Sequence, residues 1–299
     1  MIVAVTGSSG LVGTALVESL EKCDHLVRRL VRRAVRDDDH EIHWDPAVGE
    51  IDANELNGVD AVVHLAGEGL ADHRWSDAFK AKIRDSRLQG TRLLCETLAG
   101  LSSKPDVLCS ASAVGYYGDR GAEWMDETSP PGDGFLAEVC RDWEAATAPA
   151  RDAGIRVVNL RLGVVLSREG GALAKMLMPF KLGLGGVLGS GRQYLSWIAR
   201  DDLVAAIQYA LEDKGMAGPV NAVAPEPATN REFTKALGRM LGRPTVMAMP
   251  AFAARLAFGE MADEMLLSGA RVAPRVLCAS GFTFEYPQLE AALRHELAL

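Results

Sequence analysis

The chain opens with Met1-Ile-Val-Ala-Val-Thr6, which runs directly into Gly7-Ser-Ser-Gly10-Leu-Val-Gly13 and then into Thr14-Ala-Leu-Val-Glu-Ser-Leu20. The first piece is a short apolar run typical of a buried strand, and the last begins an amphipathic helix. Three glycines therefore lie where a strand turns into a helix. Glycine permits the tight turn, lets the backbone approach a pyrophosphate, and lets the helix pack closely on the sheet.

This turn predicts a dinucleotide site. The free N–H groups at the start of a helix, together with its partial positive charge, favour a phosphate at that position. A tight strand-to-helix turn that binds no ligand is the alternative. The predicted cofactor-binding residues of the turn are Gly7, Ser8, Ser9, Gly10, Leu11, Val12 and Gly13.

Composition excludes several classes of protein. The chain has 299 residues, 48% of them hydrophobic, which is enough for a large core, and its net charge of −8 argues against a nucleic-acid or anionic-membrane surface. Its five cysteines are odd in number and include no C-x-x-C pair, which indicates reduced thiols in a cytoplasmic protein. We expect no signal peptide, no membrane span and no nucleic-acid partner, and a monomer or homodimer.

The first half of the chain alternates apolar strands with helices, which predicts an α/β fold with a doubly wound, Rossmann-type parallel sheet. The predicted strands are Ile2–Thr6, Leu26–Val31, Ala61–Ala66, Asp106–Ala111 and Arg156–Leu160. The predicted helices between them are Leu11–Lys22, Trp75–Ala99 and Phe135–Ala153. In such sheets the ligand lies beyond the carboxyl ends of the strands.

The alternation of strands and helices ends at about residue 165. A glycine-rich stretch, 183–191, and further helical segments follow. We expect helices over Asp201–Glu212, Asn230–Gly242 with Asn230 as N-cap, Glu260–Gly269 and Pro287–Leu297. The predicted division is a core over 1–165 and a smaller, mainly helical lobe over 166–299, interleaved with the core. A distinct helical region begins at about residue 245.

The ends of the strands supply further candidates for the cofactor site. Arg32 and Arg33 follow the second strand, where an acidic residue would favour NAD; guanidinium groups suit a 2′-phosphate, so we predict NADP(H). A solvated basic strand end is the alternative. The other predicted cofactor-binding residues are Leu65, Ala66, Gly67, Arg87 and Ser110.

No metal site is expected. His40 and His43 lie in a polar stretch with no third ligand nearby, so we interpret them as surface histidines.

Several stretches together resemble a known family. The glycine triplet, His64-Leu-Ala-Gly67 and Ser110-Ala-Ser112 with Tyr116-Tyr117-Gly118 are similar to extended short-chain dehydrogenases/reductases, the group that includes nucleotide-sugar epimerases. Further stretches narrow the resemblance to the atypical, YfcH-type "epimerase family" over nearly the whole chain. They are Trp44-Asp45-Pro46, Ser86-Arg87-Leu88, the block 179–198, Gly259-Glu-Met-Ala262 and Gly281-Phe282.

The chain departs from the superfamily at the positions that usually carry the chemistry. Active members use a Tyr-x-x-x-Lys pair, which a glutamate follows four residues after the Lys. When Glu144 is aligned with that glutamate, Leu136 falls at the Tyr position and Cys140 at the Lys position. Leucine has no proton to give, and a neutral thiol does not stabilise a phenolate. Arg87 replaces the usual asparagine, and Ala199 replaces the histidine of the family's Ser-Trp-Ile-His motif.

The remaining candidates for catalysis are Ser112, Tyr116, Tyr117 and Cys140. Packing at the strand end is an equal alternative for the two tyrosines, and burial is an alternative for the thiol. Arg87 suits a phosphate, a ribose or a substrate anion, with a surface ion pair as its alternative. Glu68 suits either a ribose contact or a solvated carboxylate.

Three functions are compatible with these residues. The first is an NADP(H)-dependent oxidoreductase acting on a small or sugar-derived carbonyl, with Ser112 and a tyrosine or water polarising it. The second is a non-catalytic NADP(H)-binding sensor that has lost the proton relay. The third is a nucleotide-sugar epimerase, which would need the same relay.

Overall fold

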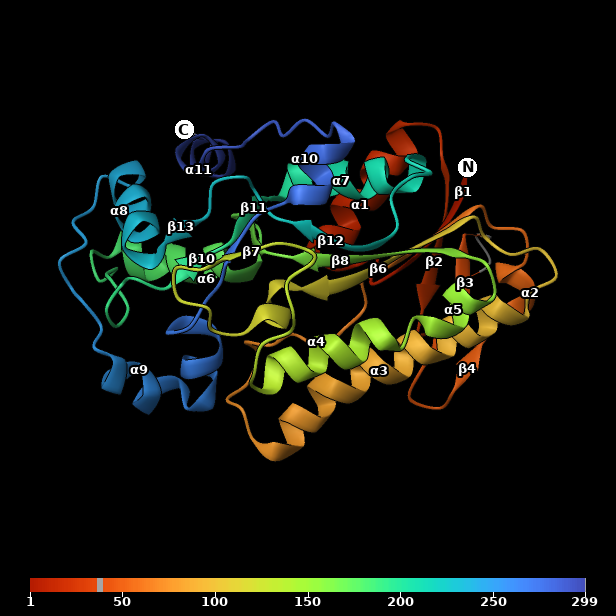
Figure 1. Ribbon diagram of the computed structural model, residues 1–299, viewed down its shortest axis with the longest axis horizontal. Helices are drawn as coiled ribbons and strands as arrows, with labels where there is room; N and C mark the ends of the chain where they lie inside the picture. Colours follow the sequence, from red (N-terminus) through yellow and green to blue (C-terminus); the bar gives the residue numbers. More distant parts are fainter. Residues whose placement is uncertain (37–39, 299) are drawn as a thin grey trace.

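The central sheet of the protein, seen in a computed structural model that describes residues 1–36 and 40–298, lies between two layers of helices (Figure 1). Its strand order is β12-β8-β6-β5-β1-β2-β3-β4, and every neighbouring pair is parallel except β3 with β4. The strands are β1 (Ile2–Thr6), β2 (Leu26–Val31), β3 (Glu41–Asp45), β4 (Glu50–Ile51), β5 (Ala61–His64), β6 (Val107–Ala113), β8 (Arg156–Leu162) and β12 (Gly218–Ala222).

The strand order confirms the predicted doubly wound fold. From β1 the chain adds β2 and β3 on one side, then returns to add β5, β6, β8 and β12 on the other. The switch point is therefore between β1 and β5, where Thr6 pairs in register with His64. Ligands of such sheets bind in the crevice beyond this point, so the fold places the glycine turn and the segment after His64 beside each other.

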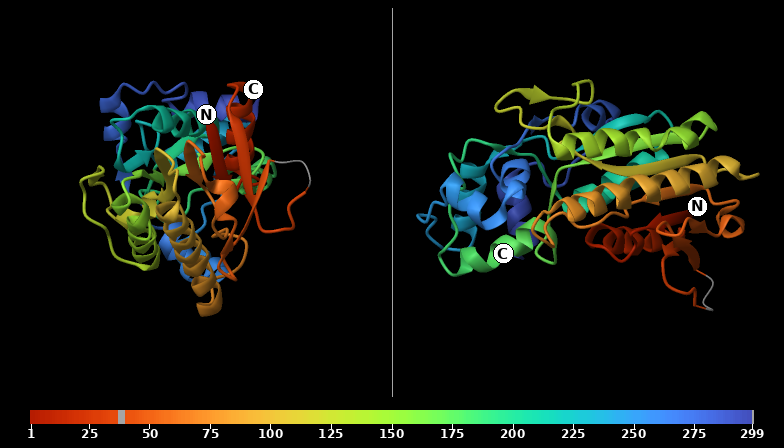
Figure 2. Two further views of the ribbon diagram at one scale, coloured as in Figure 1. Left: turned by 90° about the vertical axis from the view of Figure 1, so that its right-hand side faces the viewer. Right: turned by 90° about the horizontal axis from the view of Figure 1, so that it is seen from below.

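Helices cover both faces of the sheet because successive strand residues point to opposite sides and both sides are apolar. Val3 and Val5 pack with the layer of α1 and α7, whereas Ala4 packs with α3 and α5. Figure 2 shows α3 and α4 side by side along one face. The layer helices are α1 (Leu11–Lys22) and α7 (Arg200–Glu212) on one face, and α3 (Asp77–Gly100), α4 (Phe135–Ala145) and α5 (Ala148–Asp152) on the other.

The C-terminal lobe has a core of its own, which includes Trp197, Phe233, Leu237 and Leu293. Its helices are α6 (Gly171–Lys181), α8 (Asn230–Met240), α9 (Ala251–Phe258) and α11 (Leu289–Leu297). Strand β12, which follows residue 165, nevertheless joins the main sheet. The shorter elements are α2 (Ala53–Leu56), η1 (Val114–Tyr117), β7 (Trp124–Met125), β9 (Val164–Leu166), β10 (Tyr194–Leu195), β11 (Trp197–Ala199), β13 (Ala228–Thr229), η2 (Ala262–Leu266), β14 (Arg271–Val272) and α10 (Arg275–Ser280).

Three predicted helices differ from those observed. The helix predicted over Phe135–Ala153 is two helices, because Pro149 lacks the N–H that a continuous helix needs and starts α5 instead. The N-cap of α8 is Thr229, which forms a capping box with Glu232, so the prediction of Asn230 as N-cap was wrong by one residue. The helix predicted over Glu260–Gly269 is reduced to the π-helical turn η2.

Candidate functional site

The glycine turn has no room for side chains at two of its three glycines. Gly7 has φ +67°, and a Cβ on it would lie 2.9 Å from the Ala66 nitrogen. A Cβ on Gly13 would lie 2.1 Å from the Gly7 oxygen, so the first turn of α1 presses against the end of β1. Gly10 is the N-cap of α1 and offers no side-chain cap. The first N–H groups of α1 are thus left for a ligand, as a pyrophosphate cradle requires.

A buried hydrogen-bonded network fixes this turn to the segment after β5. Thr6 Oγ1 accepts from the N–H groups of Leu65 and Ala66, at 3.1 and 3.2 Å, and lies 2.7 Å from His64 Nδ1. His64 Nε2 lies 2.9 Å from Thr91 Oγ1, which also accepts from Trp143 Nε1 at 2.8 Å. Because Thr6 Oγ1 already accepts two hydrogen bonds, its own proton is donated to His64 Nδ1. The proton of the neutral His64 ring is therefore on Nε2. Burial lowers the pKa of His64 to about 4, so the ring is neutral.

The two arginines after β2 differ in their surroundings. Arg33 is paired with Glu41, whose pKa is lowered mainly by that hydrogen bond. Arg32 is exposed, and within 1–36 and 40–298 it forms no ion pair. Both residues stand at the strand end that meets the adenosine ribose in this fold, and Arg32 is the one whose guanidinium is available to a 2′-phosphate.

Arg87 lies underneath the segment that follows β5. A Cβ on Gly67 would lie 3.4 Å from Arg87 Cζ, and that guanidinium also packs over the Trp143 ring, 5.0 Å from its centroid. Its Nη1 donates to the Ile83 carbonyl at 3.1 Å, and burial lowers its pKa. Arg87 therefore places a positive charge in a low-dielectric setting beside Gly67. The neighbouring Glu68 is paired with Lys82 at 2.9 Å.

Ser112 takes part in a chain of buried polar contacts that joins five elements. Its hydroxyl donates to Glu144 Oε1 at 2.7 Å, and Glu144 accepts from Arg161 Nε and Nη2 at 2.8 and 2.9 Å. Arg161 Nη1 lies 2.9 Å from Tyr117 Oη, which donates to Asn221 Oδ1 at 2.7 Å. Burial alone would lower the pKa of Arg161, but the hydrogen bonds to Glu144 raise it overall. Both carboxylate oxygens of Glu144 and all three guanidinium nitrogens of Arg161 thus have hydrogen-bond partners.

The two adjacent tyrosines occupy different environments. Tyr117 is fully buried, and burial raises its pKa to about 12. Tyr116 is half-buried, and the Arg161 guanidinium lies 3.5 Å from its ring centroid. These positions favour a structural role for Tyr117 and leave Tyr116 as the phenol that a substrate can reach.

Leu136 and Cys140, which the sequence alignment places at the usual relay positions, pack against the end of β6. A Cβ on Gly115 would lie 3.4 Å from Leu136 Cβ and 3.8 Å from Cys140 Sγ, so both side chains pack beneath η1 at the end of β6. Burial raises the pKa of Cys140 to about 12. A neutral, buried thiol is a poor nucleophile, which weighs against the catalytic reading of Cys140.

The other predicted cofactor-binding residues divide into two groups. Leu11 and Val12 are half-buried beside the cradle, and Leu11 packs against Gly170 and Gly171 at the start of α6. Lys175 of α6 donates to the Ala71 carbonyl at 2.8 Å, so α6 contacts the segment after β5. Ser110 is fully buried, and its hydroxyl donates to the Ala111 carbonyl at 3.5 Å.

The ion pair of Glu144 and Arg161, and the amide of Asn221 beside it, were not predicted from the sequence. Arg161 and Asn221 are polar residues inside apolar strands, β8 and β12, and a charge at such a position is normally paired. That signal was present in the sequence. It could not identify Glu144 as the partner, since the two residues meet only once α4 covers the sheet.

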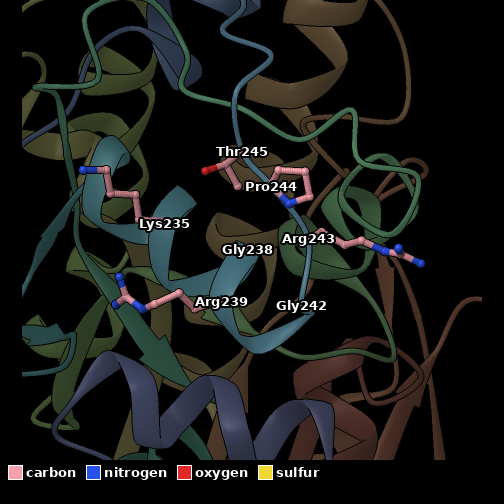
Figure 3. Close-up of a pocket in the computed structure, with 7 residues that line it drawn as sticks. All are labelled: Lys235, Gly238, Arg239, Gly242, Arg243, Pro244 and Thr245. Carbon is pink, nitrogen blue, oxygen red and sulfur yellow. The ribbon is translucent and has the colours of Figure 1, made fainter.

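The hollow at the end of α8 lies outside this site (Figure 3). Lys235, Arg239 and Arg243 line it, and Arg239 is paired with Glu290 of α11. Within the described residues, no helix combines the length and apolar character that crossing a bilayer demands.

Known proteins match this chain along its whole length. Residues 3–222 match the model of the NAD dependent epimerase/dehydratase family, and residues 249–296 match a domain of unknown function, DUF1731. Epimerase family protein Mb2239 of Mycobacterium bovis is 49% identical over 292 residues, which cover 98% of this chain and 96% of that protein.

Two crystal structures are similar in both sequence and fold. Human epimerase family protein SDR39U1 (isoform 2) with NADPH has a TM-score of 0.91 and 37% identity, covering 100% of both chains. The nucleoside-diphosphate sugar epimerase of Corynebacterium glutamicum has a TM-score of 0.82 and 42% identity, covering 99% of this chain and 58% of that one.

Proposed function

The chain belongs to the NAD-dependent epimerase/dehydratase family, and we propose that it binds NADP(H) and uses it to reduce a small or sugar-derived carbonyl compound. The family match confirms the resemblance to atypical short-chain dehydrogenases/reductases that the sequence indicates. The single observation that carries the proposal is the cradle of Gly7 and Gly13, in which a Cβ would strike backbone atoms.

The residues around the cradle fit an NADP(H) molecule. The uncapped start of α1 suits the pyrophosphate, and the exposed Arg32 suits the 2′-phosphate. The half-buried guanidinium of Arg87 suits a negative group that passes over Gly67. In support, the human relative at 37% identity was crystallised with NADPH.

The chemistry available differs from that of the usual relay. NADPH supplies a hydride when it is bound, and the protein must supply the proton that the carbonyl oxygen gains. Ser112 is only 1% exposed and donates its own proton to Glu144, so its hydroxyl is not free to polarise a substrate carbonyl. We assign the proton donor to Tyr116 Oη, with the Arg161 guanidinium holding the ring in place.

Turnover of carbonyl compounds tests this proposal. Oxidation of NADPH is followed at saturating cofactor with a panel of aldehydes, ketones and keto sugars. The expected result is turnover of at least one member, reduced roughly 100-fold or more by Tyr116→Phe with NADPH affinity unchanged.

Tyr117→Phe is the matched control, since its phenol is buried and should affect stability more than turnover. Absence of turnover above background across the panel, or full activity of Tyr116→Phe, would count against the reductase and its proton donor respectively.

A non-catalytic NADP(H)-binding protein is the second candidate. Leu136 and Cys140 at the relay positions, and the commitment of the Ser112 proton to Glu144, favour it. This candidate predicts NADPH binding without turnover, accompanied by a cofactor-dependent change in oligomeric state. Light scattering after size-exclusion chromatography, with and without NADPH, distinguishes the two.

A further inference from the structure

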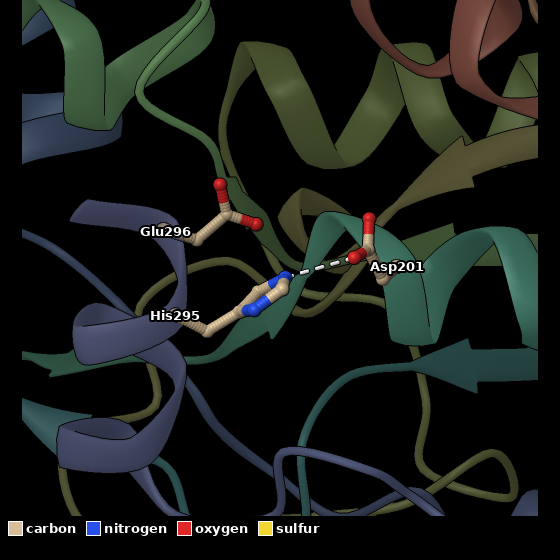
Figure 4. Close-up of side chains that lie close together, drawn as sticks. All are labelled: Asp201, His295 and Glu296. Atoms are coloured by element: carbon tan, nitrogen blue, oxygen red, sulfur yellow. Dashed lines mark hydrogen bonds and ion pairs between the residues drawn. The ribbon is translucent and has the colours of Figure 1, made fainter. Parts of the chain in front are cut away.

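Three potential metal ligands gather where α7 begins and α11 ends, although the sequence analysis expects no metal site. Asp201, His295 and Glu296 each turn one ligand atom toward the others, and these atoms all lie within 4.8 Å of one another (Figure 4). The carboxylates and imidazole come from residues almost a hundred positions apart in the sequence. We propose that this cluster binds a divalent transition-metal cation of the Zn²⁺ or Mn²⁺ class.

Glu296 supplies the observation that points to a ligand. Its side chain is only 5% exposed, and its Oε1 has no hydrogen-bond partner among the described residues. An unpartnered buried carboxylate oxygen is costly because it has lost its water and gained nothing in exchange. A cation in the cluster would satisfy this oxygen.

His295 is oriented as a metal-binding histidine is oriented. Its Nε2 lies 2.8 Å from Asp201 Oδ2, and its Nδ1 lies 3.0 Å from Tyr286 Oη, whose proton goes to Glu285 at 2.8 Å. Each ring nitrogen of His295 thus has one polar partner, and Nε2 lies beside the Asp201 carboxylate. Outer hydrogen bonds of this kind fix the imidazole of metal sites.

The donor set selects the class of metal. One imidazole and two carboxylates suit Zn²⁺, Mn²⁺ or Co²⁺, whereas Ca²⁺ and Mg²⁺ prefer oxygen ligands alone. The charge of the two carboxylates is partly opposed by Arg200, which lies 3.5 Å from Asp201 Oδ1 and is also paired with Glu169. We therefore expect weaker binding than at a closed structural zinc site.

An open cavity of about 840 Å³ adjoins the cluster and offers an entry path. Tyr286, Arg294 and His295 lie on its wall, together with Arg168. It leaves room for water to complete the coordination, as three-ligand sites require. Since α7 belongs to the sheet layer and α11 to the C-terminal lobe, a bound cation would fasten the last helix to the core.

Metal titration of the intact, untagged chain tests the proposal. After removal of metal with EDTA, the protein is titrated calorimetrically with ZnCl₂, MnCl₂ and MgCl₂, and its melting temperature is measured with each. The expected result is one equivalent of Zn²⁺ or Mn²⁺, little response to Mg²⁺, and a higher melting temperature, because a ligand that binds only the native state stabilises it.

Variants locate the cation. Glu296→Gln and His295→Ala should each weaken binding by about tenfold or more. His43→Ala is the matched control, since the carboxylate that His43 faces within residues 1–36 and 40–298 is Glu50 alone, at 3.4 Å, and the change should leave binding unchanged.

Absence of saturable Zn²⁺ and Mn²⁺ binding would overturn the proposal. Binding that both variants retain at full strength would also overturn it, because the cation would lie elsewhere. If Glu296→Gln does not fold, His295→Ala alone decides, since its ring is partly exposed.

Discussion

Arg32 is the residue whose environment bears most directly on cofactor choice. Arg33, beside it, is committed to Glu41, whereas Arg32 forms no ion pair within the described part of the chain. The sequence predicts both arginines as 2′-phosphate ligands, because it cannot tell which one has a partner across β3. Because Arg33 is paired with Glu41, we expect Arg32 to contribute more than Arg33 to binding the 2′-phosphate.

Arg32→Ala should weaken NADPH binding by roughly tenfold or more, since a hydrogen bond to a charged group contributes about 1.5–3 kcal/mol. NADH binding should change less than about twofold, because NADH has no 2′-phosphate for the guanidinium to contact. Fluorescence titration with each cofactor measures both affinities. Equal losses for the two cofactors would refute the assignment, and Arg33→Ala serves as the neighbouring comparison.

His64 makes stability depend on pH. Its pKa is about 4 in the native protein and 6.5 in the unfolded chain, so between these values the unfolded chain binds more protons. Its contribution is therefore complete above pH 6.5 and is lost as the pH falls toward 4. The loss amounts to roughly 3 kcal/mol, because the ring cannot be charged where it is buried.

Urea unfolding at pH 7, 6 and 5 measures this effect. Relative to wild type, His64→Gln should be less stable at pH 7 and should show a shallower fall in the free energy of unfolding between pH 6.5 and 4.5. Carboxylate titrations are common to both proteins and cancel in the comparison. The exposed His40→Gln is the control, and identical pH slopes for wild type and His64→Gln would contradict the account.

At the scale of elements, the strongly patterned segments are predicted well and the irregular ones are not. Strands Ile2–Thr6 and Leu26–Val31 and helix Leu11–Lys22 match the sequence expectation to the residue. Helix α9 lies in the helical region predicted from about residue 245, but its bounds were not predicted, because its apolar residues include exposed ones such as Phe252 and Leu256, at 72% and 77%, and give no one-sided pattern. The periodic spacing of apolar residues indicates which face of a helix is buried, so it does not identify a helix that is mostly exposed.

The ion pair between Glu144 and Arg161 joins α4 to β8, and breaking it should be costly. Glu144→Ala leaves the Arg161 guanidinium, which is 3% exposed, without its carboxylate, and should destabilise the protein by about 3–5 kcal/mol. Combining Glu144→Leu with Arg161→Met removes both charges and should recover most of that loss. Chemical denaturation measures the free energies of unfolding.

The surface pair of Arg151 and Asp152 supplies the control. Its side chains are 67% and 69% exposed, so Asp152→Ala should change stability by less than about 0.5 kcal/mol. A Glu144→Ala variant as stable as this control would show that the buried pair does not hold α4 to the sheet.

At the scale of the whole molecule, the alternation of strands and helices is sufficient to predict the doubly wound sheet and its ligand-binding edge. The cofactor cradle is predictable as well, since Gly7, Gly10 and Gly13 lie within seven residues of one another and their roles are local. The network from Ser112 to Asn221 is not predictable in the same way, because its members come from five separate elements. Their pairing is decided by how the helices lie on the sheet.

The central claim is that the glycine cradle holds NADP(H). Fluorescence titration of the purified chain with NADPH and with NADH tests it most directly, alongside Gly13→Ala and the control Gly100→Ala, where an added Cβ meets nothing within 4 Å. The account predicts saturable NADPH binding, at least about tenfold tighter than NADH, that Gly13→Ala abolishes and Gly100→Ala retains. Absence of saturable NADPH binding to the wild-type chain, or undiminished binding to Gly13→Ala, would contradict it.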